Sequence, residues 1–294
     1  MSRRVIGLDA GGTKLLAGVV DEAGSVLHRN VHPWPRGASR EDVLRLFREA
    51  LDEAGDADAI GVGLPATMDI ANGVAIGCRH LPIEGFGFRD WLATETGLPV
   101  WVDNDATLAL LAEAQRGAAR HATDAVLLTI GTGIGGGIMS GGRLVRGDRG
   151  AAGEPGHMTI EADGPPCPGN CPNRGCLEAF VSGPALARMG WPTAADAIAA
   201  ARGGDEDARV ALEQMGEKLG VGLASLMNLL DPEVIVIGGG AMAAGELLLG
   251  PAREELRRRA LPPGRDLVRI VEAKFGPDAG MLGGAVLAFD GLDG

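Results

Sequence analysis

Short apolar runs alternate with amphipathic stretches along most of the chain. The runs that predict buried strands are residues 5–8, 59–64, 99–102 and 234–237. The stretches with apolar residues at helical spacing are residues 40–53, 105–116 and 212–230. Strands that alternate with helices are typical of an α/β fold, in which ligands bind where loops leave the carboxyl ends of the strands. The pattern therefore predicts an α/β protein with its site on such loops.

One pattern of strands and glycines occurs twice. Residues 5–27 read VIGLDAGGTKLLAGVVDEAGSVL, and residues 125–145 read AVLLTIGTGIGGGIMSGGRLV. Each predicts a strand, a glycine loop, a second strand, a turn and a third strand. We therefore expect two lobes, residues 1–118 and residues 119–294, each opened by a hairpin, with the active site in the cleft between them. We also expect the last helix, from about Gly280, to pack back on the first lobe.

The overall charge argues against a nucleic-acid partner. The 294 residues carry a formal net charge of −12. Non-specific binding of nucleic acid depends on Lys and Arg that neutralise phosphates, so we expect no nucleic-acid partner. No apolar run approaches the ~20 residues of a membrane span, and residues 1–9 are too short for the core of a secretory signal. We expect a cytoplasmic protein, where a cysteine cluster binds metal more readily than it forms disulfides.

Three glycine loops follow predicted strands. In the first, the glycines let backbone amides approach an anion, Thr13 and Lys14 offer a hydroxyl and a charge, and Asp9 is placed to orient a hydrated Mg²⁺. A single loop of this kind is as well explained by a tight hairpin without a ligand, but three of them favour phosphate binding. The candidate nucleotide-binding residues are Asp9, Gly11, Gly12, Thr13, Lys14, Gly131, Thr132, Gly133, Gly238, Gly239 and Gly240. Neither of the first two loops matches the P-loop or the Rossmann fingerprint.

The segment 102–106 reads VDNDA and joins a predicted strand to a predicted helix. One interpretation is that Asn104 or Asp105 only caps the helix. The other is that Asp105 acts as a general base, which accepts the proton of an attacking hydroxyl during phosphoryl transfer. Spacing alone leaves both interpretations open.

Three of the four cysteines fall within ten residues of one another. They are Cys167, Cys171 and Cys176, and His157 lies ten positions before the first. A Cys₃His set fills the four positions of tetrahedral Zn²⁺, which is typical of a structural rather than a catalytic metal. Buried or free thiols are the alternative. Cys78 stands apart, and we expect it to be a small buried apolar residue.

Together the motifs resemble the ROK family of sugar kinases and repressors, within the actin, hexokinase and heat-shock ATPase superfamily. They are LDAGGTK (8–14), VDNDA (102–106), LTIGTGIGGGI (128–138), GAAGEPGH (150–157) and GCLE (175–178), in the family's order. The resemblance covers nearly the whole chain. It implies a two-lobed actin-like ATPase fold, which is ribonuclease H-like and internally duplicated. It also implies ATP with Mg²⁺, a structural Zn²⁺, and phosphorylation of a hexose.

The resemblance assigns roles to individual residues. It implies that Asp105 is the catalytic base and that Asn104 contacts a sugar hydroxyl. Further hydrogen bonds to the sugar are implied for Glu154, His157 and Glu178. Such a set of polar groups discriminates between sugars, because an analogue that lacks one hydroxyl leaves a buried polar group unpaired.

Departures from the family's pattern bear on the substrate and the metal. His80 stands before Leu-Pro where glucokinase-like members usually carry Asn, and Ala66 stands where the turn that begins at Gly63 usually has glycine. We keep His80 and Gly63 as substrate-binding candidates, because imidazole still hydrogen-bonds a hydroxyl. The family's zinc ligands correspond to His157, Cys167, Cys171 and Cys176. The interval between the first two cysteines is two residues longer than usual.

We therefore expect an ATP-dependent hexose kinase with D-glucose as the leading substrate. The alternatives within this class are N-acetylmannosamine, N-acetylglucosamine, mannose, fructose and allose as acceptors, and polyphosphate as donor. A catalytically silent sugar sensor is the alternative of another class. A ROK repressor is expected to carry a helix-turn-helix module ahead of the first glycine loop, whereas Asp9 lies almost at the start of this chain. The resemblance also implies a homo-oligomer, either a dimer or a tetramer.

Overall fold

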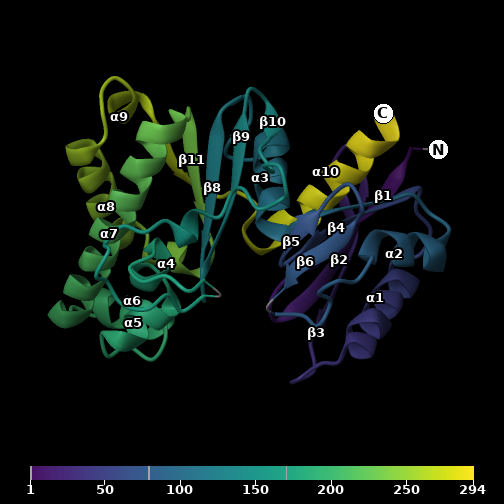
Figure 1. The fold of residues 1–294 in the computed structure, drawn as a ribbon, viewed down its shortest axis with the longest axis horizontal. Coiled ribbons are helices and arrows are strands. Elements are labelled where there is room, and N and C mark those ends of the chain that lie inside the picture. Colours follow the sequence, from purple (N-terminus) through teal and green to yellow (C-terminus); the bar gives the residue numbers. More distant parts are fainter. Residues whose placement is uncertain (1, 79, 170) are drawn as a thin grey trace. The chain divides into compact units, whose positions relative to one another are not determined.

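The computed structural model describes residues 2–78, 80–169 and 171–294 (Figure 1). These residues form two compact units. Unit 1 comprises Met1–Arg120, Leu144–Ala152 and Lys274–Gly294, and unit 2 comprises His121–Arg143 and Gly153–Ala273. The lobe boundary that the sequence predicts at residue 118 stays a proposal.

Unit 1 is built on a five-stranded sheet in the order β3-β2-β1-β4-β7. Its strands are β1 (Arg4–Ala10), β2 (Lys14–Asp21), β3 (Val26–Pro33), β4 (Ala59–Leu64) and β7 (Val100–Asn104). The first three form antiparallel pairs, whereas β1, β4 and β7 run parallel. A second, two-stranded sheet contains β5 (Ala66–Asp69) and β6 (Val74–Cys78). The carboxyl ends of β1, β4 and β7 therefore lie at one edge of the larger sheet.

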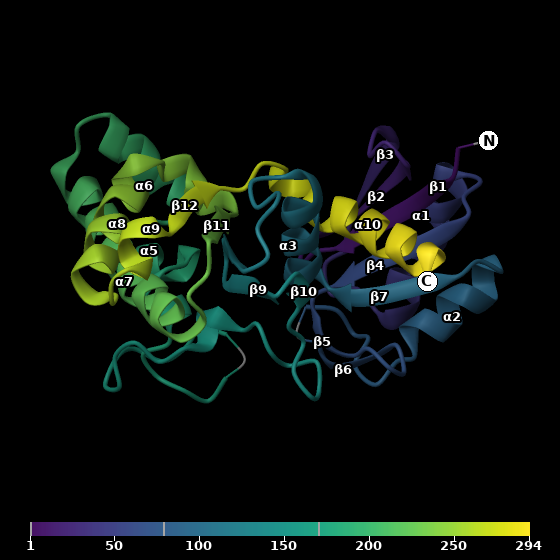
Figure 2. The same cartoon turned by 90° about the horizontal axis from the view of Figure 1, so that it is seen from above.

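Helices cover both faces of this sheet. They are α1 (Arg40–Ala54), α2 (Phe88–Thr96), α3 (Asp105–Arg116) and α10 (Ala279–Asp293), with a short 3₁₀ helix η3 (Gly276–Asp278) before the last. Phe47 of α1 packs with Leu8 of β1 in one apolar core, and Met281 of α10 packs with Val5 in another. Since neighbouring odd and even strand positions point to opposite faces, α1 and α10 lie on opposite sides of β1. Figure 2 shows α10 running along β1 and β4.

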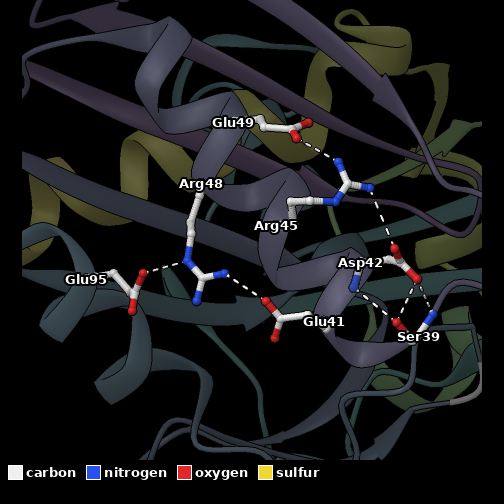
Figure 3. A network of polar contacts seen from close by, with 7 residues as sticks. All are labelled: Ser39, Glu41, Asp42, Arg45, Arg48, Glu49 and Glu95. Carbon is white, nitrogen blue, oxygen red and sulfur yellow. Dashed lines mark hydrogen bonds and ion pairs between the residues drawn. The ribbon is translucent and has the colours of Figure 1, made fainter.

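The exposed side of α1 carries a network of ion pairs (Figure 3). The helix begins with a capping box in which Ser39 and Asp42 exchange hydrogen bonds. Farther along, Arg48 contacts Glu41 and, with its Nε 2.6 Å from a carboxylate oxygen, Glu95 of α2. Exposed pairs of this kind contribute about 0–1 kcal/mol each. The buried residue Phe47, with the apolar face of α1, therefore does more to hold the helix on the sheet than these pairs do.

Unit 2 repeats the arrangement of the first sheet. Its strands are β8 (Ala125–Ile130), β9 (Ile134–Ser140), β10 (Arg143–Leu144), β11 (Val234–Gly238) and β12 (Arg269–Glu272). They lie in the order β10-β9-β8-β11-β12, with β8 antiparallel to β9 and parallel to β11. In both sheets the hairpin that carries the glycine loop is followed outward by parallel strands. The predicted internally duplicated α/β fold is confirmed.

The helices of unit 2 include one that begins earlier than the chain's pattern indicates. They are α4 (Leu177–Phe180), α5 (Gly183–Arg188), α6 (Ala194–Arg202), α7 (Glu206–Leu230), α8 (Glu246–Arg259) and α9 (Gly264–Leu267), with 3₁₀ helices η1 (Pro155–His157) and η2 (Gly240–Ala244). Helix α7 begins six residues before the predicted start at residue 212. The side chain of Asp205 caps it, and the first turn is polar, so no apolar periodicity marks it. None of the helices in the described residues combines the length and apolar character that crossing a bilayer requires.

Candidate functional site

The parallel strands of unit 1 bring several candidate residues into one row. Asp9 at the end of β1 is in register with Gly63 of β4, and Gly63 is in register with Asp103 of β7. Asp105 begins α3 directly after β7. The row lies at the carboxyl ends of the strands, which is where ligands bind in open α/β sheets. Residues that lie far apart in the sequence thus meet at one edge.

The first glycine loop is fixed by a tryptophan that the sequence analysis does not identify. The backbone N–H of Trp34 donates to the carbonyl oxygen of Thr13 (3.1 Å), and its indole Nε1–H donates to that of Gly11 (2.7 Å). Both bonds engage loop carbonyls. Gly12 and Thr13 are exposed, whereas Lys14 is half-buried at the start of β2. A loop whose carbonyls are held by Trp34 keeps its amides available to an anionic ligand.

Asp9 lies below this loop in an unusual electrostatic setting. Its Oδ1 atom is buried and has no hydrogen-bond partner among the described residues. Burial, reinforced by the negative charge of Asp105, raises the pKa of Asp9 from 3.8 to about 7, although Lys14 opposes the rise. A buried, unpaired carboxylate oxygen costs free energy unless a cation or an ordered water meets it. The setting therefore fits the Mg²⁺ that the sequence implies here.

Replacing Asp9 with asparagine is expected to stabilise the protein in magnesium-free, nucleotide-free buffer at pH 8. Between pH 4 and 7 the unfolded chain ionises Asp9 while the folded protein keeps it protonated, so stability falls as pH rises through this window. The shift from 3.8 to about 7 corresponds to at most about 4 kcal/mol. Urea unfolding at pH 4, 6 and 8 measures the gain, which should shrink towards zero at pH 4. The control is Asp52→Asn on the exposed face of α1. An equal gain from this variant, or a gain from Asp9→Asn that does not depend on pH, would show that ionising Asp9 does not destabilise the folded protein.

The corner between β7 and α3 bears out the capping interpretation of VDNDA, whereas the role of Asp105 as a general base stays a proposal. The Asn104 side chain caps α3 by accepting a hydrogen bond from the N–H of Thr107 (3.0 Å). Oδ1 of Asp105 accepts one from the N–H of Ala106 (2.8 Å). Capping therefore holds the corner, and Asp105 stays half-buried at the end of the row. Gly63 packs against this corner, because a Cβ there would lie 3.2 Å from Cα of Asp105.

His80 lies beside the first glycine loop. Its ring Cγ is 3.6 Å from the position that a Cβ on Gly12 would occupy. The side chain is exposed. The residue before it, Arg79, lies outside the described residues. Unit 1 thus brings His80, the glycine loop, Asp9 and Asp105 to the same edge.

In unit 2 the second glycine loop is held by Glu178. The N–H of Ile134 donates to Oε2 of Glu178 (2.7 Å), and this carboxylate is 6% exposed. A Cβ on Gly133 would lie 2.4 Å from the same oxygen, so a larger residue there would displace this carboxylate. The N–H of Gly183 donates to the carbonyl of Gly131 (2.8 Å). Thr132 at the tip of the loop is exposed.

The third glycine loop follows the neighbouring strand. Gly238 of β11 is in register with Thr129 of β8, so the two loops leave adjacent strand ends. Gly239 has φ 89°, and a Cβ there would lie 2.3 Å from the carbonyl oxygen of Ile130. Only glycine fits that approach. Directly after it, η2 borders a cavity of about 500 Å³ that Arg202, Arg209 and Leu247 help to line.

The four predicted metal ligands converge in unit 2. One ligand atom from each of His157, Cys167, Cys171 and Cys176 lies within 4.8 Å of the others. The sulfurs of Cys171 and Cys176 are 3.4 Å apart, and Nδ1 of His157 is 3.6 Å from the sulfur of Cys167. A tetrahedral Zn²⁺ with ligand distances of about 2.3 Å has edges of about 3.8 Å, so the donor set and its spacing fit zinc. The longer interval after Cys167 does not keep its sulfur from the cluster.

The other sugar candidates of unit 2 gather around this cluster. Glu154 precedes η1, which ends at His157, and it interacts electrostatically with His157 and Glu178. Gly169 packs between His157 and Glu178, since a Cβ there would lie 2.7 Å from Cε1 of the former and 2.4 Å from Oε1 of the latter. Cys78 is remote in the chain and half-buried in unit 1, where its thiol donates to the carbonyl of Pro65.

Comparison with known proteins shows to which family the chain belongs. The model of the ROK family matches residues 5–290. The chain is 34% identical to the glucokinase of Thermotoga maritima, over 99% of both chains. Among solved structures, a ROK family glucokinase from Streptomyces griseus in complex with glucose and AMPPNP is 33% identical with a TM-score of 0.85, covering 98% of this chain and 99% of that one. A ROK hexokinase from Thermus thermophilus is 36% identical with a TM-score of 0.83, covering 99% and 100%. These matches, over nearly the full length, show that the chain belongs to the ROK family.

Proposed function

We propose that this protein is an ATP-dependent hexose kinase that transfers the γ-phosphoryl group of ATP to D-glucose, giving glucose 6-phosphate and ADP. One observation carries the proposal: Asp105 lies beside Asp9 and the first glycine loop, at the carboxyl ends of the parallel strands of unit 1. An acceptor hydroxyl and a phosphate chain both need to be held there for in-line transfer. The similarity to glucokinases supports glucose as the acceptor.

Asp105 is the proposed general base. Its carboxylate accepts the proton of the sugar hydroxyl as the oxygen attacks the γ-phosphorus, and the bond between that phosphorus and the β–γ bridging oxygen breaks to release ADP. The cap made by Asn104 and the bond from Ala106 fix the backbone that carries this carboxylate. A base held in this way is positioned before the substrate arrives, which lowers the entropy cost of reaching the reactive geometry.

The nucleotide is proposed to bind through the three glycine loops. Backbone amides of the loops at Gly11 and Gly131 face the phosphates, and Lys14 and Thr13 add a charge and a hydroxyl. Mg²⁺, when bound, neutralises charge on the phosphates, and Asp9 is the residue that would orient it. The cavity beside η2, which follows the Gly238–Gly240 loop, is the proposed place for the adenosine. Polyphosphate remains the alternative donor.

Polar side chains are proposed to recognise the sugar. They are those of Asn104, His80, Glu154, His157 and Glu178. One oxygen of Glu178 already accepts from Ile134, so its second oxygen is the one proposed for a sugar hydroxyl. A mismatched hydroxyl would leave one of these groups unpaired, which is the source of selectivity.

A structural Zn²⁺ is proposed at His157, Cys167, Cys171 and Cys176. Nδ1 of His157 faces the sulfur of Cys167, which leaves Nε2 for the sugar. The metal would fix the orientation of the imidazole, and it would thereby couple the cysteine loop to sugar binding. We further propose that the protein works as a homo-oligomer, a dimer or a tetramer, as the resemblance to the ROK family implies.

Sugar-dependent release of ADP tests the proposed function. The purified protein is incubated with ATP and Mg²⁺ and, one at a time, with glucose, mannose, fructose, allose, N-acetylmannosamine and N-acetylglucosamine. We expect the highest kcat/KM with glucose. A higher value with an N-acetylhexosamine would reassign the substrate within the same reaction. Sugar binding without any turnover would indicate the sugar sensor instead of the kinase.

A further inference from the structure

The strap, defined here as Leu144–Ala152, has a distinctive place in the chain. It packs as part of unit 1, although the segments before and after it, His121–Arg143 and Gly153–Ala273, belong to unit 2. Its last residue is two positions before Glu154, a proposed sugar ligand. The strap is therefore a part of unit 1 that leads in the sequence into the Glu154 segment.

A partly buried ion pair holds the strap to the end of β7. Nε and Nη2 of Arg146 each lie 2.7 Å from Oδ2 of Asp103. Asp103 is 3% exposed, and a buried carboxylate of this kind persists only with a well-placed partner. Two N–H groups of the planar guanidinium converge on this one oxygen, a fixed arrangement that a lysine ammonium does not supply.

The same carboxylate reaches the catalytic corner. Its other oxygen, Oδ1, accepts a hydrogen bond from the backbone N–H of Asn104 (2.8 Å). Asn104 in turn caps α3, whose first residue is Asp105. A short chain of contacts thus runs from Arg146 through Asp103 to the backbone that carries the proposed base.

A second contact anchors the far end of the strap. Gly150 has φ 69°, and a Cβ there would lie 1.8 Å from the carbonyl oxygen of Met68 in β5. This approach admits only glycine. Just beyond Gly150, the N–H of Ala152 donates to the carbonyl of Arg146 (3.1 Å), which closes the strap into a loop.

We propose that Arg146 is a positioning residue for the phosphoryl transfer: through Asp103 it fixes the Asn104–Asp105 corner. The inference rests on the proposed function. It assigns Arg146 to sugar binding and proton transfer rather than to nucleotide binding, because Trp34 holds the first glycine loop independently.

Arg146→Met should lower kcat/KM for glucose about a hundredfold, through both a lower kcat and a higher KM, since small displacements of reacting groups carry penalties of this size. The KM for ATP should stay within about threefold, because the contacts proposed for the nucleotide are made by the glycine loops.

Arg146→Lys should recover part of the loss. The double variant Asp103→Asn/Arg146→Met should remain folded, as it buries no unpaired charge, and should stay as slow as Arg146→Met. Arg149→Met is the matched control, because Arg149 lies on the same strap and is 87% exposed.

Trypsin cleavage after Arg149, followed by mass spectrometry, reports the attachment of the strap without any catalysis. Cleavage should be faster in both Arg146→Met and the double variant than in the wild type. The proposal is overturned if either variant keeps wild-type kcat and KM for glucose, or if cleavage is unchanged. A wild-type protein without sugar-dependent turnover would reject the proposed function itself, and the cleavage rates would then still decide whether Arg146 holds the strap.

Discussion

Replacing Asp105 with asparagine should lower kcat for sugar phosphorylation about a thousandfold and change KM for the sugar only a few-fold. General-base catalysis contributes about 10²–10⁴ in rate, and asparagine removes the base while keeping the size of the side chain. The amide oxygen can still accept the hydrogen bond from Ala106, so the corner should keep its shape. Steady-state ADP release at saturating ATP and glucose measures the loss.

The matched control for this prediction is Asp90→Asn. Asp90 lies in α2 of the same unit, and its carboxylate is 76% exposed beside Arg89. We expect wild-type turnover from this variant. If Asp105→Asn retains kcat within about tenfold of the wild type, the base has been assigned to the wrong residue.

Loss of the zinc cluster should produce the second large effect. Cys176 is fully buried, and its sulfur lies 3.4 Å from that of Cys171. Structural zinc contributes about 10–16 kcal/mol in small zinc domains; in this larger fold we expect Cys176→Ser to cost about 3 kcal/mol or more. That corresponds to a fall in Tm of about 6–12 °C. The KM for glucose should rise about tenfold or more, because His157 loses the metal that orients it.

Metal analysis and thermal unfolding check this prediction together. The wild type should contain one zinc per chain, and Cys176→Ser should contain none. Cys78→Ser is the matched control, since Cys78 lies in unit 1 and contacts Pro65 rather than the cluster. Zinc-free wild-type protein with an unchanged Tm in Cys176→Ser would mean that the three thiols and the His157 imidazole cluster without a structural metal.

Much of the fold follows from local patterns. Apolar runs on both sides of a glycine loop predicted both hairpins, at Gly11 and at Gly131, because a second apolar strand resumes directly after each loop. The first turn of α7 was missed, since Glu206 and its neighbours carry charge rather than apolar periodicity. Helix starts that rest on a capping side chain, as at Asp205, leave a weaker trace in the sequence than apolar faces do.

The candidate site was predictable where a motif carries its chemistry in consecutive residues. VDNDA marked Asp105, and the cysteine run marked the cluster. Trp34 and Arg146 were not predictable in this way, because each acts on residues more than twenty positions away. Their partners are backbone carbonyls and a buried carboxylate, and no sequence pattern distinguishes an arginine that reaches such a carboxylate from one on the surface.

The phosphorylated product provides the most direct test of the central claim. Wild-type protein is incubated with ATP, Mg²⁺ and D-glucose, and glucose 6-phosphate is measured by its oxidation with NADP⁺ in a coupled assay, beside the ADP released. We predict one glucose 6-phosphate for each ADP, and neither product in significant amount when glucose is left out. ADP released without any sugar phosphate, from glucose or from any other sugar of the panel, would contradict the assignment of this protein as a hexose kinase.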